Sequence, residues 1–489
     1  MNPDDNNQTT SRHGVIFRAI LGVALAFFVV GGFLAGLFFL THLGDLVGTL
    51  APSRANQGDG IVNPGASSAS PSVLGLPTRQ ASDPRFAFLL MGYGGAGHDG
   101  AYLTDSMIAA IVDPSQKTIS LLSIPRDIWA PLVFSEKTTV YNKINTAYAF
   151  AEDSSLYPDR LSRYKGSQGP GTFAMDTVSR LLGIPIPYYL ALDFAGFRQA
   201  IDTVGGIDVN VPDAFSARYP ANDDPAIDPS WKVVKFSKGQ QHMDGERAIE
   251  YARAREAIDN LAEGSDFARS QRQRLIMEAF KARLFQPGGL IHLPQLLAVG
   301  AGHMDTNYAL PSVVQFAQLA LGWKDVRFYQ TALTNQNYLV DSTGAEGTYI
   351  LVPDSPDHSW AWVQAFAQRL WRDPELGVAM ANTEVVVEND TGVAGLAGRV
   401  GADLDKLGYR VGAPITGSLQ SHSQVVGQTG GEGKALVRGL EADLHVKLGE
   451  AQAAGGSDPA RITLKIGSDF ANSPSASGSP DASAPARKP

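Results

Sequence analysis

A chain of 489 residues is too long for one ordinary domain and predicts two or three folded units. Its formal net charge of −9 and pI near 5.5 argue against a general nucleic-acid binder, which needs a broad basic surface. The chain has no cysteine, which excludes disulfides, thiol nucleophiles and cysteine-ligated zinc and leaves the compartment open.

The first predicted element is a membrane span at Ala19–Leu40. These 22 uncharged residues would form a helix of ~33 Å, against a hydrocarbon core of ~30 Å. No clear cleavage site of the A-x-A kind follows, which favours a retained anchor over a signal peptide. Arg12 and Arg18 precede the span and Asp45 follows it, so the positive-inside rule predicts a cytoplasmic tail at residues 1–18. We therefore expect a single-pass protein of the cell membrane, with the bulk of the chain outside the cytoplasm.

Residues 41–83 are rich in Ser, Pro, Ala and Gly and predict a linker, because they lack the apolar periodicity of a core. In residues 84–372 predicted strands and helices alternate, which indicates an α/β core with helices packed on a sheet. The predicted strands are Phe86–Met91, Met107–Val112, Thr118–Ile124 and Tyr188–Leu192, and the predicted helices are Thr172–Leu182 and Phe194–Val204.

A glycine-rich loop follows the first predicted strand. Gly92, Gly94 and Gly97 have the G-x-G-x-x-G spacing of a dinucleotide-binding loop, which requires a helix that opens at the third glycine. The run Met107–Val112 instead predicts strand, loop, strand, and the Gly-Lys-Ser/Thr of a Walker A loop is missing. We interpret the glycines as serving turn geometry and close backbone approach.

A second folded unit is predicted at residues 380–467. It begins with a strand at Thr383–Asn389 and continues with two strand-helix-strand passes, which indicates a small C-terminal α/β domain. The remaining residues, 468–489, are predicted to be disordered by their composition.

Arginine gathers at three places in this acidic chain. Arg126 and Asp127 stand at the end of a predicted strand in SIPRD. Arg253 and Arg255 follow in IEYARAR; they share a face if that segment is extended, whereas a helix would set them about 200° apart. Guanidinium groups suit a phosphate because they bind it through two parallel charge-assisted hydrogen bonds.

The third place is a predicted helix that has Ser265 or Asp266 as its N-cap. Arg269 and Gln273 are four residues apart and share one face, close to a helix N-terminus that favours anions. The alternative for any of these arginines is solvation or an ion pair with nearby acidic residues, which are Glu250, Glu256, Asp259 and Glu263.

Carboxylates near the glycine loop could complete a phosphate site. Asp105, and Asp99 with His98, are candidate ligands for Mg²⁺, which uses one or two carboxylates plus substrate phosphates. The alternatives are a turn or capping carboxylate for Asp105 and an exposed loop side chain for His98. No H-E-x-x-H or G-x-S-x-G motif offers a competing chemistry.

In this order the motifs resemble those of the LytR-CpsA-Psr (LCP) family of extracytoplasmic phosphotransferases. The segment after residue 380 resembles the small LytR C-terminal domain often appended to family members. The matching segments are TDSM, SIPRD, KINTAYAF, PYYLALDFAGF, DTVGGIDVNV, HMDGERAIEYARAR and DFARSQRQ.

The resemblance implies a central mixed β-sheet flanked by helices, one membrane span and a transfer reaction. Family members move a glycopolymer from a polyprenyl-pyrophosphate carrier onto peptidoglycan by forming a phosphodiester, with magnesium on the pyrophosphate. It further implies that Asp127 or Asp266 accepts the proton of the acceptor hydroxyl, and that Asp105 holds the metal. The implied pyrophosphate ligands, of which Arg126 is also catalytic, are Arg126, Lys143, Arg253, Arg255, Arg269 and Gln273.

The sequence departs from the family at the glycine loop. Many members have a second metal carboxylate in a Gly-x-Asp pattern after the first strand, where this chain reads Gly92-Tyr93-Gly94. Tyr93 is a poor magnesium ligand, so we expect Asp99 to replace that carboxylate, or the metal site to be weakened. A weakened site would favour one alternative, a non-catalytic binder of polyprenyl pyrophosphate or of an anionic wall polymer. A lipid pyrophosphatase, in which water replaces the acceptor hydroxyl, is the other.

Overall fold

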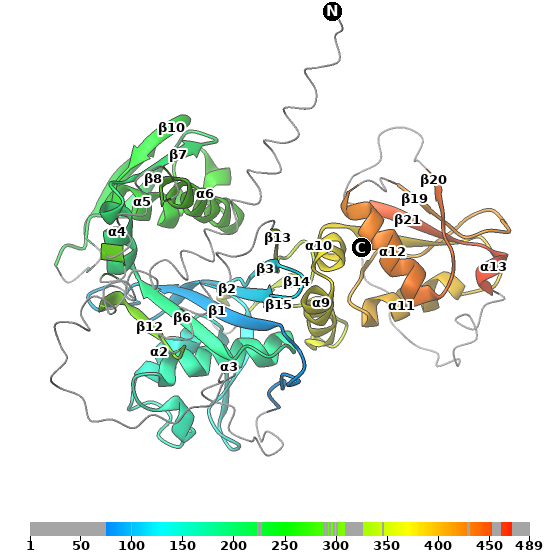
Figure 1. Cartoon of the computed structure of the whole chain (residues 1–489), viewed down its shortest axis with the longest axis horizontal. Helices are drawn as coiled ribbons and strands as arrows, with labels where there is room; N and C mark the ends of the chain where they lie inside the picture. The colour runs from blue at the N-terminus through cyan, green and yellow to red at the C-terminus, as the bar shows by residue number, and fades with distance from the viewer. Residues whose placement is uncertain are drawn as a thin grey trace, which may run out of the picture.

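The computed structural model describes residues 75–471 except 99, 223, 225–226, 285, 287–291, 293–294, 297–298, 300–301, 309–325, 345–346, 428–430 and 452–460. Figure 1 shows three parts, namely a central sheet with its helices, a lobe in green and a C-terminal domain in orange and red. No helix within the described residues is long and apolar enough to cross a membrane, and the predicted span at Ala19–Leu40 lies outside them.

The central sheet is mixed, as predicted, and has six strands in the order β12-β6-β1-β2-β3-β13. β1, β2 and β3 are antiparallel neighbours, whereas β6 runs parallel to β1 and β13 runs parallel to β3. The prediction of strand, loop, strand around the glycines is confirmed, because the chain turns from β1 directly into its antiparallel partner β2. The strands are β1 (Phe86–Tyr93), β2 (Thr104–Asp113), β3 (Thr118–Ser123), β6 (Tyr188–Asp193), β12 (Met304–Thr306) and β13 (Arg327–Ala332).

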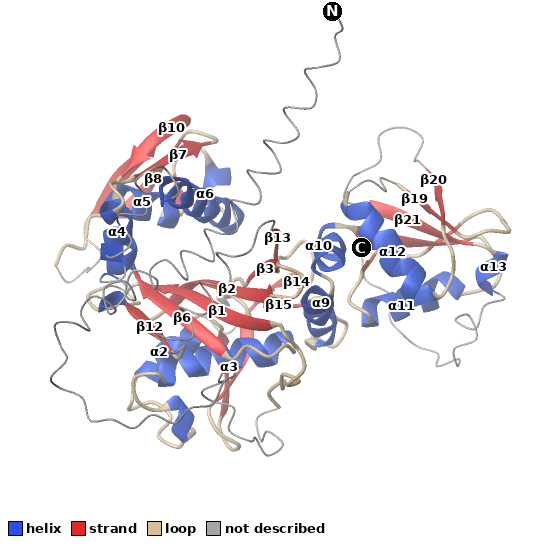
Figure 2. Ribbon diagram, viewed as in Figure 1, coloured by secondary structure: helices blue, strands red, loops and turns tan. Residues whose placement is uncertain are grey.

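Both faces of the central sheet carry apolar side chains. Leu89 and Met91 on β1 belong to the largest core, which includes residues of three helices of this part and of a fourth that joins the C-terminal domain, whereas Phe88 belongs to a smaller cluster on the other face. Figure 2 shows helices α2 and α3 beside the strands. These core helices are α2 (Thr146–Glu152), α3 (Gly169–Leu182) and α9 (Ala361–Arg372). Two hairpins complete this part, β4 (Trp129–Val133) with β5 (Thr139–Lys143) and β14 (Leu339–Thr343) with β15 (Tyr349–Pro353).

The green lobe is inserted between β6 and β12 in the sequence and has a hydrophobic core of its own. Its strands form a β10-β7 pair and a three-stranded sheet in the order β11-β8-β9. Asp193, the last residue of β6, caps the first helix by accepting a hydrogen bond of 2.7 Å from the Gly196 amide. The elements are α4 (Phe194–Thr203), β7 (Ile207–Val211), β8 (Phe215–Pro220), β9 (Trp231–Phe236), β10 (Gly239–Met243), α5 (Gly245–Arg253), β11 (Glu256–Ala257), η3 (Leu261–Gly264) and α6 (Asp266–Leu284).

The C-terminal domain has one sheet, with strands in the order β17-β16-β21-β19-β20 and β18 beside β16. It extends past the predicted end at residue 467, because Phe470 on the short helix α13 is buried in its core. The elements are α10 (Pro374–Asn382), β16 (Glu384–Asn389), α11 (Leu396–Lys406), β17 (Arg410–Val411), β18 (Ile415–Thr416), β19 (Gln424–Val426), α12 (Glu432–Leu444), β20 (Gly449–Ala451), β21 (Arg461–Ile466) and α13 (Ser468–Ala471).

Helix α10 joins the C-terminal domain to the central part. Val378 and Ala381 pack into the core of the central sheet, whereas Leu376 and Met380 on the same helix pack into the C-terminal core. Polar contacts cross the same junction, including a hydrogen bond of 2.8 Å from the Tyr338 hydroxyl to the Gly408 carbonyl. The two cores therefore share one helix and are not separated by a free linker.

Candidate functional site

Asp105 lies near the start of β2 and is bound by arginines from two other segments. Arg126 Nη1 lies 2.9 Å from its Oδ1, and Arg255 Nη2 lies 3.4 Å from its Oδ2. Burial alone would raise the pKa of Asp105, but the charges of Arg255, Arg126 and Arg269 hold that pKa below its ordinary value. The structure thus brings together residues from all three arginine-rich segments around one carboxylate, which we call the arginine cluster: Asp105, Arg126, Arg255 and Arg269.

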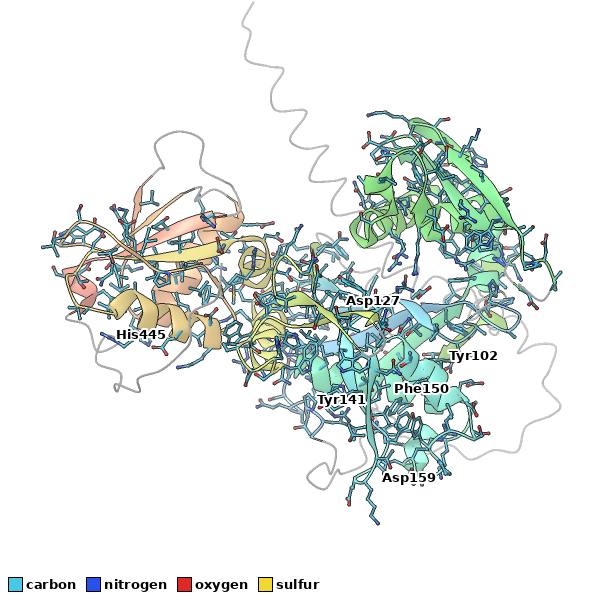
Figure 3. The ribbon with its side chains drawn as sticks, turned by 180° about the vertical axis from the view of Figure 1, so that it is seen from behind. Tyr102, Asp127, Tyr141, Phe150, Asp159 and His445 are labelled. Carbon is cyan, nitrogen blue, oxygen red and sulfur yellow. The ribbon has the colours of Figure 1, made fainter. Side chains whose placement is uncertain are left out.

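Arg126 reaches this cluster because the chain leaves β3 through Ile124 and Pro125. The neighbouring residue Asp127 is 4% exposed, and its two carboxylate oxygens lie 2.6 Å from Lys143 Nζ and 3.4 Å from Arg126 Nε. Figure 3 labels Asp127 beside the strands of the central sheet. Asp127 is buried and paired with both cations, so it holds them next to each other.

Arg253 and Arg255 lie on different elements, because Arg253 is the last residue of α5 and Arg255 lies beyond the helix. Helix α5 ends at Arg253, so the extended conformation considered for Tyr251–Arg255 is wrong. The Arg253 guanidinium stacks 4.4 Å from the centroid of the Phe194 ring and donates a hydrogen bond of 3.0 Å to the Tyr219 hydroxyl. Arg255, beyond the end of the helix, points to Asp105 instead. The chain leaves the helical conformation at Ala254, and burial of the apolar face of α5, which includes Ala248 and Ile249, stabilises the helix up to that point.

Helix α6 carries Arg269 and Gln273. The Ser265 hydroxyl accepts a hydrogen bond of 3.2 Å from the Ala268 amide. Of the two N-cap candidates, Ser265 and Asp266, Ser265 is therefore the one that caps the helix. Arg269 is 7% exposed and Gln273 is partly buried. Asp266 is the first residue of α6, and its side chain lies outside the described residues.

Arg272, on the same helix, is a structural residue that the sequence analysis missed. It is 1% exposed, and its guanidinium donates to the carbonyls of Tyr251 and Ala254 and to the carbonyl and carboxylate of Glu263. It therefore ties the loop between α5 and α6 to both helices. The sequence offered one signal for a separate role. Arg272 follows Arg269 by three residues in RSQRQR, and on a helix side chains at that spacing point in directions about 60° apart, so the two arginines need not share a partner.

The acidic residues of this loop also have structural partners. Asp259 accepts a hydrogen bond of 2.7 Å from the Ser216 amide, and Glu256 lies 3.8 Å from Arg218 Nε. Glu263 forms its ion pair of 2.7 Å with Arg272. The expected alternative, an arginine paired with a nearby acid, thus holds for Arg272 and Glu263, whereas Arg255 lies 3.4 Å from Asp105, which is distant in the sequence.

Tyr93, at the end of β1, is buried in a group of aromatic rings. It stacks on Tyr148 at a centroid distance of 5.2 Å and on Tyr102 at 6.2 Å. The hydroxyls of Tyr148 and Tyr189 each donate a hydrogen bond of 2.9 Å to Asp305, whose pKa is raised by burial. Burial also raises the pKa of Tyr93 to about 12, so its hydroxyl is neutral at ordinary pH.

The residues at the glycine loop give a partial fit for magnesium. Asp105 provides one carboxylate beside the arginines, and Mg²⁺ commonly takes one or two carboxylates together with substrate phosphates. Asp99 lies outside the described residues, and the ring of His98 packs edge-on against Phe194 at 5.4 Å. Among the residues that the structure covers, no group of three or more His, Cys, Asp or Glu side chains could hold a metal ion.

Comparisons with known proteins show which proteins the chain is similar to. Residues 63–360 match the model of the LytR_cpsA_psr family, and residues 382–470 match the model described as LytR cell envelope-related transcriptional attenuator. The chain is 29% identical over 273 residues to the polyisoprenyl-teichoic acid–peptidoglycan teichoic acid transferase TagV of Bacillus subtilis, covering 55% of this chain and 61% of TagV. It thus spans less than two thirds of that relative.

A second relative is the transferase of the same description, TagU, from Bacillus licheniformis. It is 31% identical over 272 residues, which cover 56% of this chain and 74% of that protein. The crystal structure of Bacillus subtilis TagV aligns with 60% of this chain and 98% of its own, at 27% identity and a TM-score of 0.43.

Proposed function

Because the chain belongs to the LytR_cpsA_psr family, we propose that it is a phosphotransferase that moves a glycopolymer from a polyprenyl-pyrophosphate carrier onto peptidoglycan. The observation that carries this proposal is the arginine cluster, in which residues from three distant segments converge in a chain of net charge −9. The family relatives described as transferases support it.

In the proposed reaction a hydroxyl of peptidoglycan attacks the phosphorus next to the glycan. A new P–O bond forms, the bond to the bridging oxygen breaks, and polyprenyl phosphate leaves with the electron pair of that bond. Phosphoryl transfer depends mainly on positioning and on neutralising charge at the oxygens. Arg126, Arg255 and Arg269 would bind the pyrophosphate, with Arg253 and Gln273 on the adjoining helices.

Asp127 has a positioning part in this proposal. Its contacts with Lys143 and Arg126 fix both cations before the substrate binds, which lowers the cost of organising them during the reaction. Asp105 would provide a ligand for magnesium, and the ion would supply further charge neutralisation at the phosphate oxygens. We further propose that Asp99 supplies a second carboxylate and Asp266 the acceptor of the hydroxyl proton.

We also propose that the chain is held at the cell membrane by the span at residues 19–40, with the bulk of the chain outside the cytoplasm. The uncharged sequence of that segment supports this placement. The donor is then presented by the same membrane, and peptidoglycan is accessible on the same side.

The test is turnover of a polyprenyl-pyrophosphate glycan by the full-length protein, with and without a peptidoglycan fragment and magnesium. We expect joining that requires magnesium and that Arg255→Ala and Asp99→Ala both abolish. The matched control is Arg438→Ala, which removes an exposed arginine that is ion-paired 3.2 Å from Asp373 outside the cluster.

The outcomes separate the candidate functions. Joining that Arg255→Ala leaves intact would overturn the assignment of the cluster. Binding without turnover would support the non-catalytic binder, for which the missing Gly-x-Asp carboxylate is the specific observation. Release of phosphorylated glycan without an acceptor would indicate the pyrophosphatase.

A further inference from the structure

Large apolar side chains are exposed along one stretch of the green lobe, residues 227–261. Of the twelve exposed large hydrophobic residues in the described part of the chain, five lie between residues 227 and 261. Monomeric proteins normally distribute such residues singly, and a concentration of them indicates a binding surface. The five are Ile227, Trp231, Val233, Ile258 and Leu261, with exposed fractions of 72%, 50%, 53%, 51% and 78%.

Strand register puts three of these residues on one face. Trp231 and Val233 alternate along β9 with the buried Val234 and Phe236, and Val233 is paired with Arg218 on β8. The Ile258 amide continues the β11-β8 pairing by donating to the Ser216 carbonyl at 2.8 Å, which puts Ile258 on the same face. We call this the outer sheet face, formed by Ser216, Arg218, Trp231, Val233, Lys235, Glu256 and Ile258.

The outer sheet face is unusual because its opposite face already forms the core of the lobe. Ala217, Val234 and Phe236 point into that core. An antiparallel sheet that covers a core on one side normally presents polar residues on the other. Here the second side presents a tryptophan and two aliphatic side chains, so a partner other than water is indicated.

The polar residues of this face indicate the kind of partner. The Arg218 guanidinium lies 5.2 Å from the centroid of the Trp231 ring, and Lys235 projects from the same face of β9. The acidic residues beside this face are Glu256, 3.8 Å from Arg218, Asp259, which accepts from the Ser216 amide, and Asp228, which follows Ile227. Tryptophan with basic side chains is the composition found at the membrane interface, where the ring occupies the headgroup region and the cation contacts anionic lipid.

The outer sheet face adjoins the arginine cluster through a well-anchored loop. Glu256 follows Arg255 directly, and the loop with Ile258 and Leu261 ends at α6, which carries Arg269. Asp259 and Glu263 fix this loop to Ser216 and Arg272 by contacts of 2.7 Å each. Ile258 and Leu261 are thus held in solvent by a structured loop and are not exposed by a frayed one.

We propose that the outer sheet face, together with Leu261 and Ile227, docks on the surface of a bilayer that contains anionic lipid. The docked face would hold the arginine cluster at the level from which the pyrophosphate of a membrane-borne donor projects. The identity of that donor rests on the proposed function, whereas the docking itself rests on the exposed face.

The experiment uses the full-length protein, whose lack of cysteine allows single labelled positions. Leu261→Cys and Val233→Cys, each carrying an environment-sensitive fluorophore, are reconstituted with vesicles of phosphatidylglycerol and phosphatidylethanolamine. The matched control is Leu419→Cys in the C-terminal domain, because Leu419 and Leu261 are both 78% exposed. We expect brominated lipids to quench the labels at 261 and 233 and to leave the label at 419 unchanged.

Labels at 261 and 233 that brominated lipids do not quench would overturn the proposal. An apolar shift of these labels without quenching would also overturn it, because that result would identify a protein partner such as a second copy of the chain.

A second readout separates docking from catalysis. The double variant Trp231→Ser, Leu261→Ser should lower turnover of a vesicle-borne long-chain donor by roughly tenfold, because two side chains lose their apolar environment. Turnover of a water-soluble short-chain donor should not change. An equal loss with both donors would contradict docking, whereas the absence of turnover with either donor in the unsubstituted protein would refute the proposed function and leave the quenching result valid.

Discussion

The ammonium of Lys143 lies 2.6 Å from a carboxylate oxygen of Asp127, and Asp127 is buried. Lys143 ends β5 of the β4-β5 hairpin, whereas Asp127 follows the end of β3, so the pair joins the hairpin to the central sheet. The second oxygen of Asp127 faces Arg126, which in turn binds Asp105. This row of alternating charges connects the hairpin to the arginine cluster.

Asp127→Asn is expected to destabilise the fold by about 2 kcal/mol. The value lies below the range of about 3–5 kcal/mol for breaking a fully buried pair, because Lys143 is partly solvated. The control is Asp213→Asn, which breaks an exposed pair of 3.3 Å with Lys238 and should cost less than about 0.5 kcal/mol. Urea unfolding of the two variants measures the difference, and equal costs would show that the Asp127 pair does not stabilise the fold.

Arg272→Met and Arg255→Met are expected to affect different properties. The first variant should lose about 3 kcal/mol of stability, since it leaves the carboxylate of Glu263 and two buried carbonyls without their donor. The second should keep most of its stability and lose turnover, because Arg255 is partly exposed and serves the cluster. Denaturant unfolding and the transfer assay are run on both, and a stable Arg272→Met protein would refute the structural assignment.

The ion pairs of Asp105 predict a pH dependence of stability. Its folded pKa is below the ordinary value of 3.8, since the charges of Arg255 and Arg126 outweigh the effect of burial. Ionised Asp105 therefore stabilises the folded chain above pH 3.8, and this contribution is lost as the pH falls through the folded pKa. Asp105→Asn should be less stable than the unsubstituted protein at neutral pH, and the difference should shrink in acid. A difference that is independent of pH would contradict this.

Helix α10 predicts coupling between the central part and the C-terminal domain. Met380→Ala should cost about 2–5 kcal/mol, because the side chain is fully buried in the C-terminal core. Val378, on the same helix, packs into the other core, so loosening α10 should also reduce protection of the central sheet. Hydrogen exchange at β16 and β13 measures the two effects. Faster exchange confined to β16 would show that the domains unfold independently.

Much of the local organisation could be predicted from the sequence. The prediction of two strands around the glycine loop was confirmed because apolar, partly β-branched runs with no helical periodicity flank it. The family prediction was confirmed because SIPRD, HMDGERAIEYARAR and DFARSQRQ are specific as a set. The conformation of IEYARAR was not predictable, since Arg253 ends a helix that is stabilised by packing on α4 and α6.

Periodicity and composition are local properties, so the sequence was enough to predict the first strands of the central sheet, the helices near Thr172–Leu182 and Phe194–Val204, and the concentration of arginines in three segments. The role of each arginine follows from contacts between segments that are distant in the sequence. The charge of Arg269 helps to lower the pKa of Asp105, whereas Arg272, three residues later, is buried and donates a hydrogen bond to the Tyr251 carbonyl. Asp127 likewise became a partner of Lys143 because the β4-β5 hairpin pairs Trp129 with Lys143 and brings Asp127 close to the end of β5. Ion pairs of this kind join residues that are distant in the chain, so their partners are fixed by packing and not by the neighbouring sequence.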